Sequence, residues 1–137
     1  MGEPKSSTCH VVIVDDDVNN ADVIRLFVTM AGHRATTVSV RDAESLMEAV
    51  LRLQPDVGLF DLHLGCADAR DVARALRESG CVAYLVAMTG HAMEPSDSLS
   101  AGFDQHWSKP IDLEIFERVL RERARGTLMS VAERAPR

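Results

Sequence analysis

Residues 11–17 read VVIVDDD, and residues 57–61 read VGLFD. Each stretch is an apolar run, typical of a strand buried on both faces, that ends directly in aspartate. Carboxylates brought together repel, because two like charges ~4 Å apart at an effective dielectric of about 20 cost roughly 4 kcal/mol before screening. A divalent cation reverses that cost, and Mg²⁺ prefers one or two carboxylates together with water and phosphate oxygens. The two stretches therefore indicate an acidic site for metal-assisted phosphoryl chemistry.

The composition indicates one small domain that does not bind nucleic acid directly. The chain has 137 residues, enough to bury about two-thirds of the surface that its unfolded form exposes. Its net charge of −6, without a basic stripe, argues against a nucleic-acid partner. No apolar run approaches the ~18 residues of a membrane span, and no signal-peptide core follows the first residues. Because Cys9, Cys66 and Cys81 lack CxxC spacing, we expect reduced thiols and a cytoplasmic protein.

Strand and helix patterns alternate along most of the chain, with no internal repeat. Short runs at residues 34–38 and 82–88 read as further strands. The serine-rich stretch at residues 94–101 predicts a short, marginal helix anchored only by Leu99 and Ala101. Apolar side chains recur at helical spacing in four stretches: 24–31, 43–50, 69–76 and 113–120. Three aspartates stand where helix N-caps are expected: Asp17, Asp68 and Asp112.

Five strand–helix units predict an α/β fold, a doubly wound five-stranded parallel sheet with five helices on its two faces. Ligands of such sheets bind outside the carboxyl ends of the strands. Asp15 and Asp16 follow the first strand, and Asp61 ends the third. Thr89 ends the fourth, so we expect all of these side chains to share one pocket.

These residues, in this order, resemble the receiver domain of two-component response regulators. The resemblance covers about residues 8–125 and rests on the acidic pair, on Asp61, on Thr89 and on Lys109 followed by Pro110. It implies a flavodoxin-like (βα)₅ fold. Residues 126–137 show no sustained pattern, so we expect a flexible C-terminal tail there.

The resemblance implies that Asp61 accepts a phosphoryl group from a phosphohistidine on a sensor histidine kinase or a histidine phosphotransfer protein. Asp16 and Asp61 would coordinate Mg²⁺ through their carboxylates. The backbone carbonyl of His63 would supply a third ligand, and Asp15 would act partly through water.

Transfer through a largely dissociative transition state requires neutralisation of three equatorial phosphoryl oxygens. By the same resemblance, Mg²⁺ would take one oxygen, Lys109 another, and the Thr89 hydroxyl the third. The Lys109–Pro110 bond is expected to be cis in this family.

The chain also departs from the family pattern. Gly65 and Ala69 stand where receiver domains usually have proline and glycine, so we expect a looser loop. His106 occupies the position of the aromatic switch residue, so switching is expected to be sensitive to pH or weak. His63 and His91 lie two residues past the phosphoacceptor and the threonine. They either tune the phosphoryl lifetime or are exposed loop histidines.

A haloacid-dehalogenase-like phosphatase is the main alternative. Asp15 would then be its nucleophile and Asp17 its acid. Such enzymes need a further acidic pair after the lysine, where only Asp112 stands, and Asp61 would have no role. A non-phosphorylated receiver-like binding module is a third possibility, against which the complete set of five positions argues. Rossmann-type nucleotide binding is excluded, because no glycine-rich turn follows the first strand.

We therefore expect a phosphorylation-dependent signalling switch of a two-component system. It would be no enzyme beyond self-phosphotransfer and autodephosphorylation. Too few residues follow the last helix for an output domain, so the signal would pass to a downstream protein by direct contact. The fourth helix, fifth strand and fifth helix form the usual signalling face of this family, and a homodimer would form through that face.

Overall fold

Strands and helices alternate in the computed structural model, which describes residues 8–65, 67–90 and 95–134. The strands are β1 (His10–Val14), β2 (Arg34–Thr37), β3 (Val57–Asp61), β4 (Tyr84–Thr89) and β5 (Gln105–Ser108). The helices are α1 (Val18–Met30), α2 (Ala43–Leu53), α3 (Ala69–Glu78), α4 (Pro95–Ser100), α5 (Leu113–Arg125) and α6 (Val131–Arg134). None of these helices is long and apolar enough to cross a membrane.

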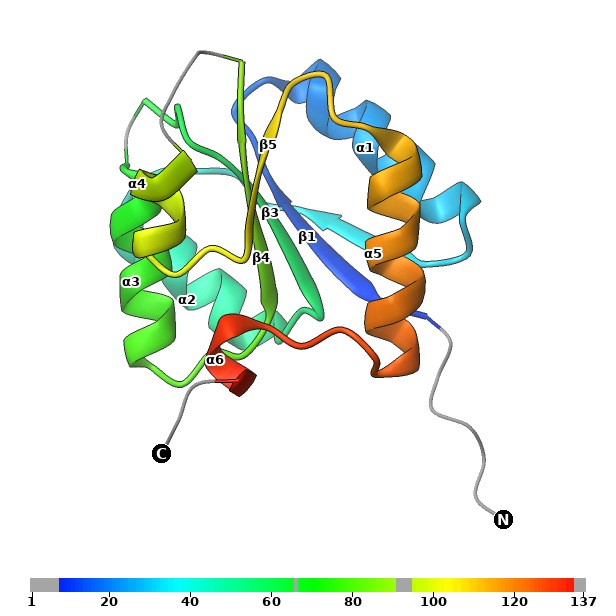
Figure 1. Cartoon of the computed structure of the whole chain (residues 1–137). Helices are drawn as coiled ribbons and strands as arrows, with labels where there is room; N and C mark the ends of the chain where they lie inside the picture. Colours follow the sequence, from blue (N-terminus) through cyan, green and yellow to red (C-terminus); the bar gives the residue numbers. More distant parts are fainter. Residues whose placement is uncertain (1–7, 66, 91–94, 135–137) are drawn as a thin grey trace.

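The five strands form one parallel sheet in the order β2-β1-β3-β4-β5. Helices α1 and α5 cover one face, and α2, α3 and α4 lie on the other (Figure 1). This arrangement confirms the predicted doubly wound α/β sheet. Because all strands run the same way, their carboxyl ends meet at one edge, where ligands of such sheets bind.

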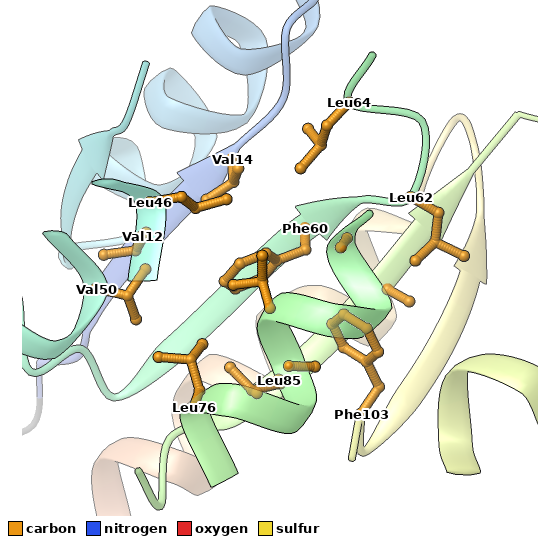
Figure 2. Packing of buried hydrophobic residues seen from close by; sticks show 14 of the residues in the cluster. Val12, Val14, Leu46, Val50, Phe60, Leu62, Leu64, Leu76, Leu85 and Phe103 are labelled. Carbon is orange, nitrogen blue, oxygen red and sulfur yellow. The ribbon is translucent and has the colours of Figure 1, made fainter. Parts of the chain in front are cut away.

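The side chains of the apolar strands pack into two hydrophobic cores, one on each face of the sheet. Val12 and Val14 of β1 face the core under α2 and α3, whereas Val11 and Ile13 face the core under α1 and α5. Phe60 lies at the centre of the first core and meets the ring of Phe103 edge-on, with centroids 5.9 Å apart (Figure 2). Burial on both faces explains why these strands read as continuous apolar runs instead of alternating.

Three helices begin at the aspartates predicted as N-caps. The carboxylate of Asp17 accepts hydrogen bonds from the backbone N–H groups of Asn19 and Asn20 at the start of α1. Asp68 and Asp112 accept equivalent bonds at the starts of α3 and α5. Each cap satisfies N–H groups that lack a partner within the helix.

The short α4 is anchored differently from the prediction. Ala101 is buried as expected, but Leu99 is 45% exposed and Ser98 is fully buried. The Ser98 hydroxyl lies 2.8 Å from Nδ1 of His106 on β5. A hydroxyl with such a partner can be buried at little cost. The prediction that Leu99 anchors this helix is therefore wrong.

The end of the chain also differs from the prediction of a flexible tail after residue 125. Gly126 ends α5 in the left-handed region at φ 79°, and residues 127–134, the C-terminal segment, then run along the amino-terminal edge of the sheet to α6 (Figure 1). Ser130 is fully buried there. The guanidinium of Arg123 holds the segment, because it donates to the carbonyls of Asp56, Val82 and Leu128 and to the carboxylate of Glu133. Residues 135–137 lie outside the described residues.

Candidate functional site

The acidic side chains converge at the carboxyl edge of the sheet, as the sequence predicted. Val14 of β1 lies opposite Phe60 of β3, so the aspartates that follow them are neighbours. One carboxylate oxygen from each of Asp15, Asp16 and Asp61 lies within 4.8 Å of the others. Asp15 and Asp61 are buried and Asp16 is exposed, so the cluster opens to solvent on one side.

Asp15 is held by three donors. Its Oδ1 accepts from the backbone N–H of Asp17 at 2.9 Å. Its Oδ2 accepts from the Asn20 amide at 2.6 Å and from the Lys109 ammonium at 2.9 Å. Burial alone would raise the pKa of Asp15, but the hydrogen bonds from Lys109, Asp17 and Asn20 outweigh it and hold the pKa below the ordinary value. Asp15 is thus a stable anion.

The negative charge of Asp61 is stabilised less by neighbouring groups than that of Asp15. Its Oδ1 accepts from the backbone N–H of His63 at 3.0 Å, and its Oδ2 lies 3.2 Å from Nζ of Lys109. Burial and the charge of Asp15 nevertheless raise the pKa of Asp61 above the ordinary value. Asp61 therefore carries a charge that the surrounding groups stabilise only in part, which is where an added cation would have most effect.

Lys109 reaches the acidic cluster from the end of β5. Its backbone N–H donates to the carbonyl of Thr89 at 2.8 Å, which fixes the start of the loop, and the Lys109–Pro110 bond is cis, as predicted. Burial lowers the pKa of Lys109, but the hydrogen bond to Asp15 and the charge of Asp61 outweigh it, so its pKa is raised. The side chain is a cation shared between two carboxylates.

Thr89 occupies the predicted place at the end of β4. It is fully buried, and it follows Met88, the residue opposite Asp61 in the sheet register. It also lies opposite Ser108, the last residue of β5. The threonine and the lysine are therefore next to each other at the edge that carries the aspartates.

Two of the three predicted histidines, His63 and His106, lie among the described residues. His63 is exposed, and its backbone N–H contacts Asp61; the role of its carbonyl as a metal ligand stays a prediction. His91 lies outside the described residues. His106 is half-buried against Ser98, and burial lowers its pKa below the ordinary value, so the ring is neutral at neutral pH. Its part in switching stays a prediction.

The loop after Asp61 is anchored by leucines instead of a proline. Leu62 and Leu64 are buried. Gly65 adopts φ 75°, which the ring of proline cannot reach, and a Cβ built on it would lie 3.7 Å from the carboxylate of Asp16. Glycine therefore suits this backbone conformation beside the site.

The donor set fits a hard divalent cation. Three carboxylates have oxygens within 4.8 Å of one another, and the Lys109 ammonium contacts two of them, so the cluster has a formal charge of −2 (−3 plus +1). Carboxylate oxygens are the ligands that Mg²⁺ selects. A divalent ion would therefore neutralise the cluster.

Asn20, whose amide donates to Asp15, is a site residue that was not predicted from the sequence. A polar side chain in the first turn of α1, directly after the acidic pair, was the available signal.

Asp17, by contrast, is exposed and caps α1. That placement, and the position of Asp61 inside the cluster, oppose the phosphatase alternative, which needs Asp17 as an acid and leaves Asp61 without a role.

The chain is thus an α/β domain with an acidic cluster and a lysine at the carboxyl edge of its sheet. A family described as "Response regulator receiver domain" matches residues 11–121. The chain belongs to this family of two-component signalling proteins.

Curated relatives agree with the family match. The DNA-binding response regulator MtrA of Mycobacterium tuberculosis (strain ATCC 25618 / H37Rv) is 31% identical over 116 residues, which cover 84% of this chain and 49% of that protein. The regulatory protein VirG of Agrobacterium tumefaciens is 27% identical over 118 residues, which cover 84% and 42%. The chain thus spans about half the length of the curated relatives it matches.

Solved structures show the same fold. The signal receiver domain of the putative response regulator NarL from Mycobacterium tuberculosis superposes with a TM-score of 0.73 at 20% identity, over 88% of this chain and 98% of that one. The receiver domain of the Francisella response regulator 1452 gives a TM-score of 0.75 at 17% identity, over 88% and 99%.

Proposed function

We propose that this receiver domain takes a phosphoryl group from a phosphohistidine onto Asp61, in the presence of Mg²⁺, and signals through protein–protein contact. The donor would be a sensor histidine kinase or a histidine phosphotransfer protein. The observation that carries the proposal is the Lys109 ammonium, which lies 2.9 Å from Asp15 and 3.2 Å from Asp61. An ammonium shared in this way is available to a third anionic group that arrives beside Asp61.

In the proposed reaction, a carboxylate oxygen of Asp61 forms a bond to phosphorus while the phosphorus–nitrogen bond of the phosphohistidine breaks. The leaving imidazole keeps the bonding electrons and takes up a proton. Asp16, Asp61 and the His63 carbonyl would hold Mg²⁺, and Asp15 would act through water. When bound, Mg²⁺ supplies positive charge to one phosphoryl oxygen.

The protein's own donors act on the other oxygens. The Lys109 ammonium turns from the carboxylates toward a second phosphoryl oxygen, and the Thr89 hydroxyl donates to the third. Asp15 keeps its bonds from Asp17 and Asn20 while the lysine moves. The buried carboxylate is therefore never left without donors, which would cost about 1–3 kcal/mol or more.

The proposed output surface lies on α4, β5 and α5. Movement of Thr89 toward the phosphoryl group would shift His106, which contacts Ser98 of α4. A downstream protein, or a second copy of the chain, would read the changed surface. In this proposal the domain catalyses only its own phosphotransfer and dephosphorylation.

We also propose a cytoplasmic location, where such kinases present their phosphohistidines. The described cysteines, Cys9 and Cys81, are free thiols, and burial raises the pKa of Cys9 to about 12. Cys9 is therefore a protonated, unreactive thiol.

Phosphoramidate, a small donor with a phosphorus–nitrogen bond, tests the proposal. With Mg²⁺ the intact chain should gain the mass of one phosphoryl group, and with a chelator it should gain none. Asp61→Asn should abolish the gain, whereas the control Asp71→Asn, at an exposed position on α3, should keep it. A wild-type chain that stays unmodified would contradict the proposal and favour a binding module that is never phosphorylated.

A further inference from the structure

One contact in the acidic cluster has an effect on the metal site that neither the family resemblance nor the proposed reaction describes. The side-chain amide of Asn20 donates to Oδ2 of Asp15 at 2.6 Å. The carboxylate that receives this bond is entirely shielded from solvent, with 0% of its side chain exposed. Asn20 itself is half-buried in the first turn of α1.

The bond settles how the two oxygens of Asp15 are used. A carboxylate oxygen has about two accepting positions. Oδ2 already takes Asn20 and Lys109, so both of its positions are filled. Oδ1 takes only the backbone N–H of Asp17. One position on Oδ1 is thus left for a water molecule or a cation.

We propose that Asn20 is a positioning residue for the metal site. Its amide fixes the rotation of the Asp15 carboxylate, so that Oδ2 serves Lys109 and Oδ1 serves the cation or its water. This inference rests on the proposed function, because it takes Mg²⁺ as the cation. Residues that orient a metal ligand typically contribute 10–100-fold to metal affinity.

The neighbouring asparagine provides a matched control. Asn19 is the same residue type in the same turn, but it is exposed, and only its backbone N–H takes part in the cap of Asp17. Asn19→Ala and Asn20→Ala therefore change helix propensity equally and differ in the contact with Asp15. Since alanine is the better helix former, both variants should fold. Asn20→Leu keeps the approximate volume and removes the donor.

The measurement is the rise in thermal unfolding midpoint of the full chain with increasing Mg²⁺, fitted for the dissociation constant. We expect Asn20→Ala and Asn20→Leu to raise the Mg²⁺ dissociation constant about tenfold, and Asn19→Ala to leave it within about twofold of wild type. The Mg²⁺ concentration for half-maximal phosphorylation by phosphoramidate should rise by the same factor.

The outcomes separate this inference from the proposed function. If both Asn20 variants lower the midpoint without Mg²⁺ but bind Mg²⁺ like wild type, Asn20 is merely structural and the inference is overturned. If the wild type itself shows no Mg²⁺-dependent rise, the proposed function fails, and the inference fails with it.

Discussion

Replacing Lys109 by methionine should destabilise the folded chain, because the lysine offsets the repulsion between Asp15 and Asp61. The change keeps most of the side chain and removes the ammonium that contacts Asp15 and Asp61 at 2.9 and 3.2 Å. The two carboxylates have oxygens within 4.8 Å of each other. At that separation and an effective dielectric of about 20, their repulsion is about 3.5 kcal/mol. Removing one partner of a buried ion pair typically costs about 3–5 kcal/mol, so we expect a loss of about 3 kcal/mol without Mg²⁺.

Mg²⁺ should restore much of that loss. The cation would occupy the negative field that the lysine no longer neutralises, so Lys109→Met should gain more stability from Mg²⁺ than wild type does. If half of the expected loss of about 3 kcal/mol is recovered, the extra gain is about 1.5 kcal/mol, or roughly tenfold in the dissociation constant.

Urea unfolding, followed by the fluorescence of the single tryptophan, Trp107, measures both effects. That indole packs against Phe116 and donates to Gln105, so it should report the loss of packing. Unfolding is compared with a chelator and with Mg²⁺. The control Arg118→Met removes a positive charge from an exposed position on α5 and should change stability by less than about 0.5 kcal/mol. A Lys109→Met chain as stable as this control in chelator, or one that gains no more from Mg²⁺ than wild type, would refute the reasoning.

Three further predictions concern the pH dependence of the site, α4 and the C-terminal segment. Because the pKa of Asp61 is raised in the folded state, its charge opposes folding above that pKa, and the penalty disappears below the unfolded pKa of about 3.9. Asp61→Asn should therefore be more stable than wild type at pH 7 without Mg²⁺, with the difference in urea midpoint vanishing below about pH 4; a constant difference would contradict this. Ser98→Ala should lower the free energy of unfolding by about 1 kcal/mol and speed hydrogen exchange in α4. Both effects should be larger than those of the control Leu99→Ala, at the exposed neighbouring position. The reverse order would show that the bond to His106 does not hold the helix. Glu133→Ala should speed hydrogen exchange at the amides of Ser130 and Val131 at least tenfold while β4 stays protected. The control Glu117→Ala, at an exposed position on α5, should leave these rates unchanged. Equal exchange rates in the two variants would mean that Arg123 and Glu133 do not hold the segment.

The sheet and the acidic edge were predictable because their signals are local. Apolar runs such as residues 57–61 mark buried strands, and a residue at a strand end falls at the ligand edge of any parallel sheet. The sequence alone therefore places Asp15 and Asp61 together, whereas the place of Lys109 beside them follows from the resemblance to receiver domains. The N-cap roles of Asp17 and its counterparts follow from similarly short patterns.

The remaining features depend on tertiary contacts with no sequence period. A six-residue helix such as α4 is too short for apolar spacing to show which side is buried, so apolarity predicts Leu99 as an anchor although Ser98 is the buried residue. Arg123 binds backbone carbonyls, which any sequence would provide. A signal for the end of the chain did exist: Ser130 and Glu133 have the spacing of a capping box, and each accepts the other's backbone N–H.

The position of the covalent phosphate is the most direct test of the proposed phosphorylation of Asp61. The chain is treated with phosphoramidate and Mg²⁺ and then reduced with borohydride, which converts an aspartyl phosphate to homoserine, and its peptides are sequenced by mass spectrometry. Homoserine is expected at position 61 alone. Homoserine at position 15, or at no aspartate in a chain that has gained a phosphoryl group, would contradict it.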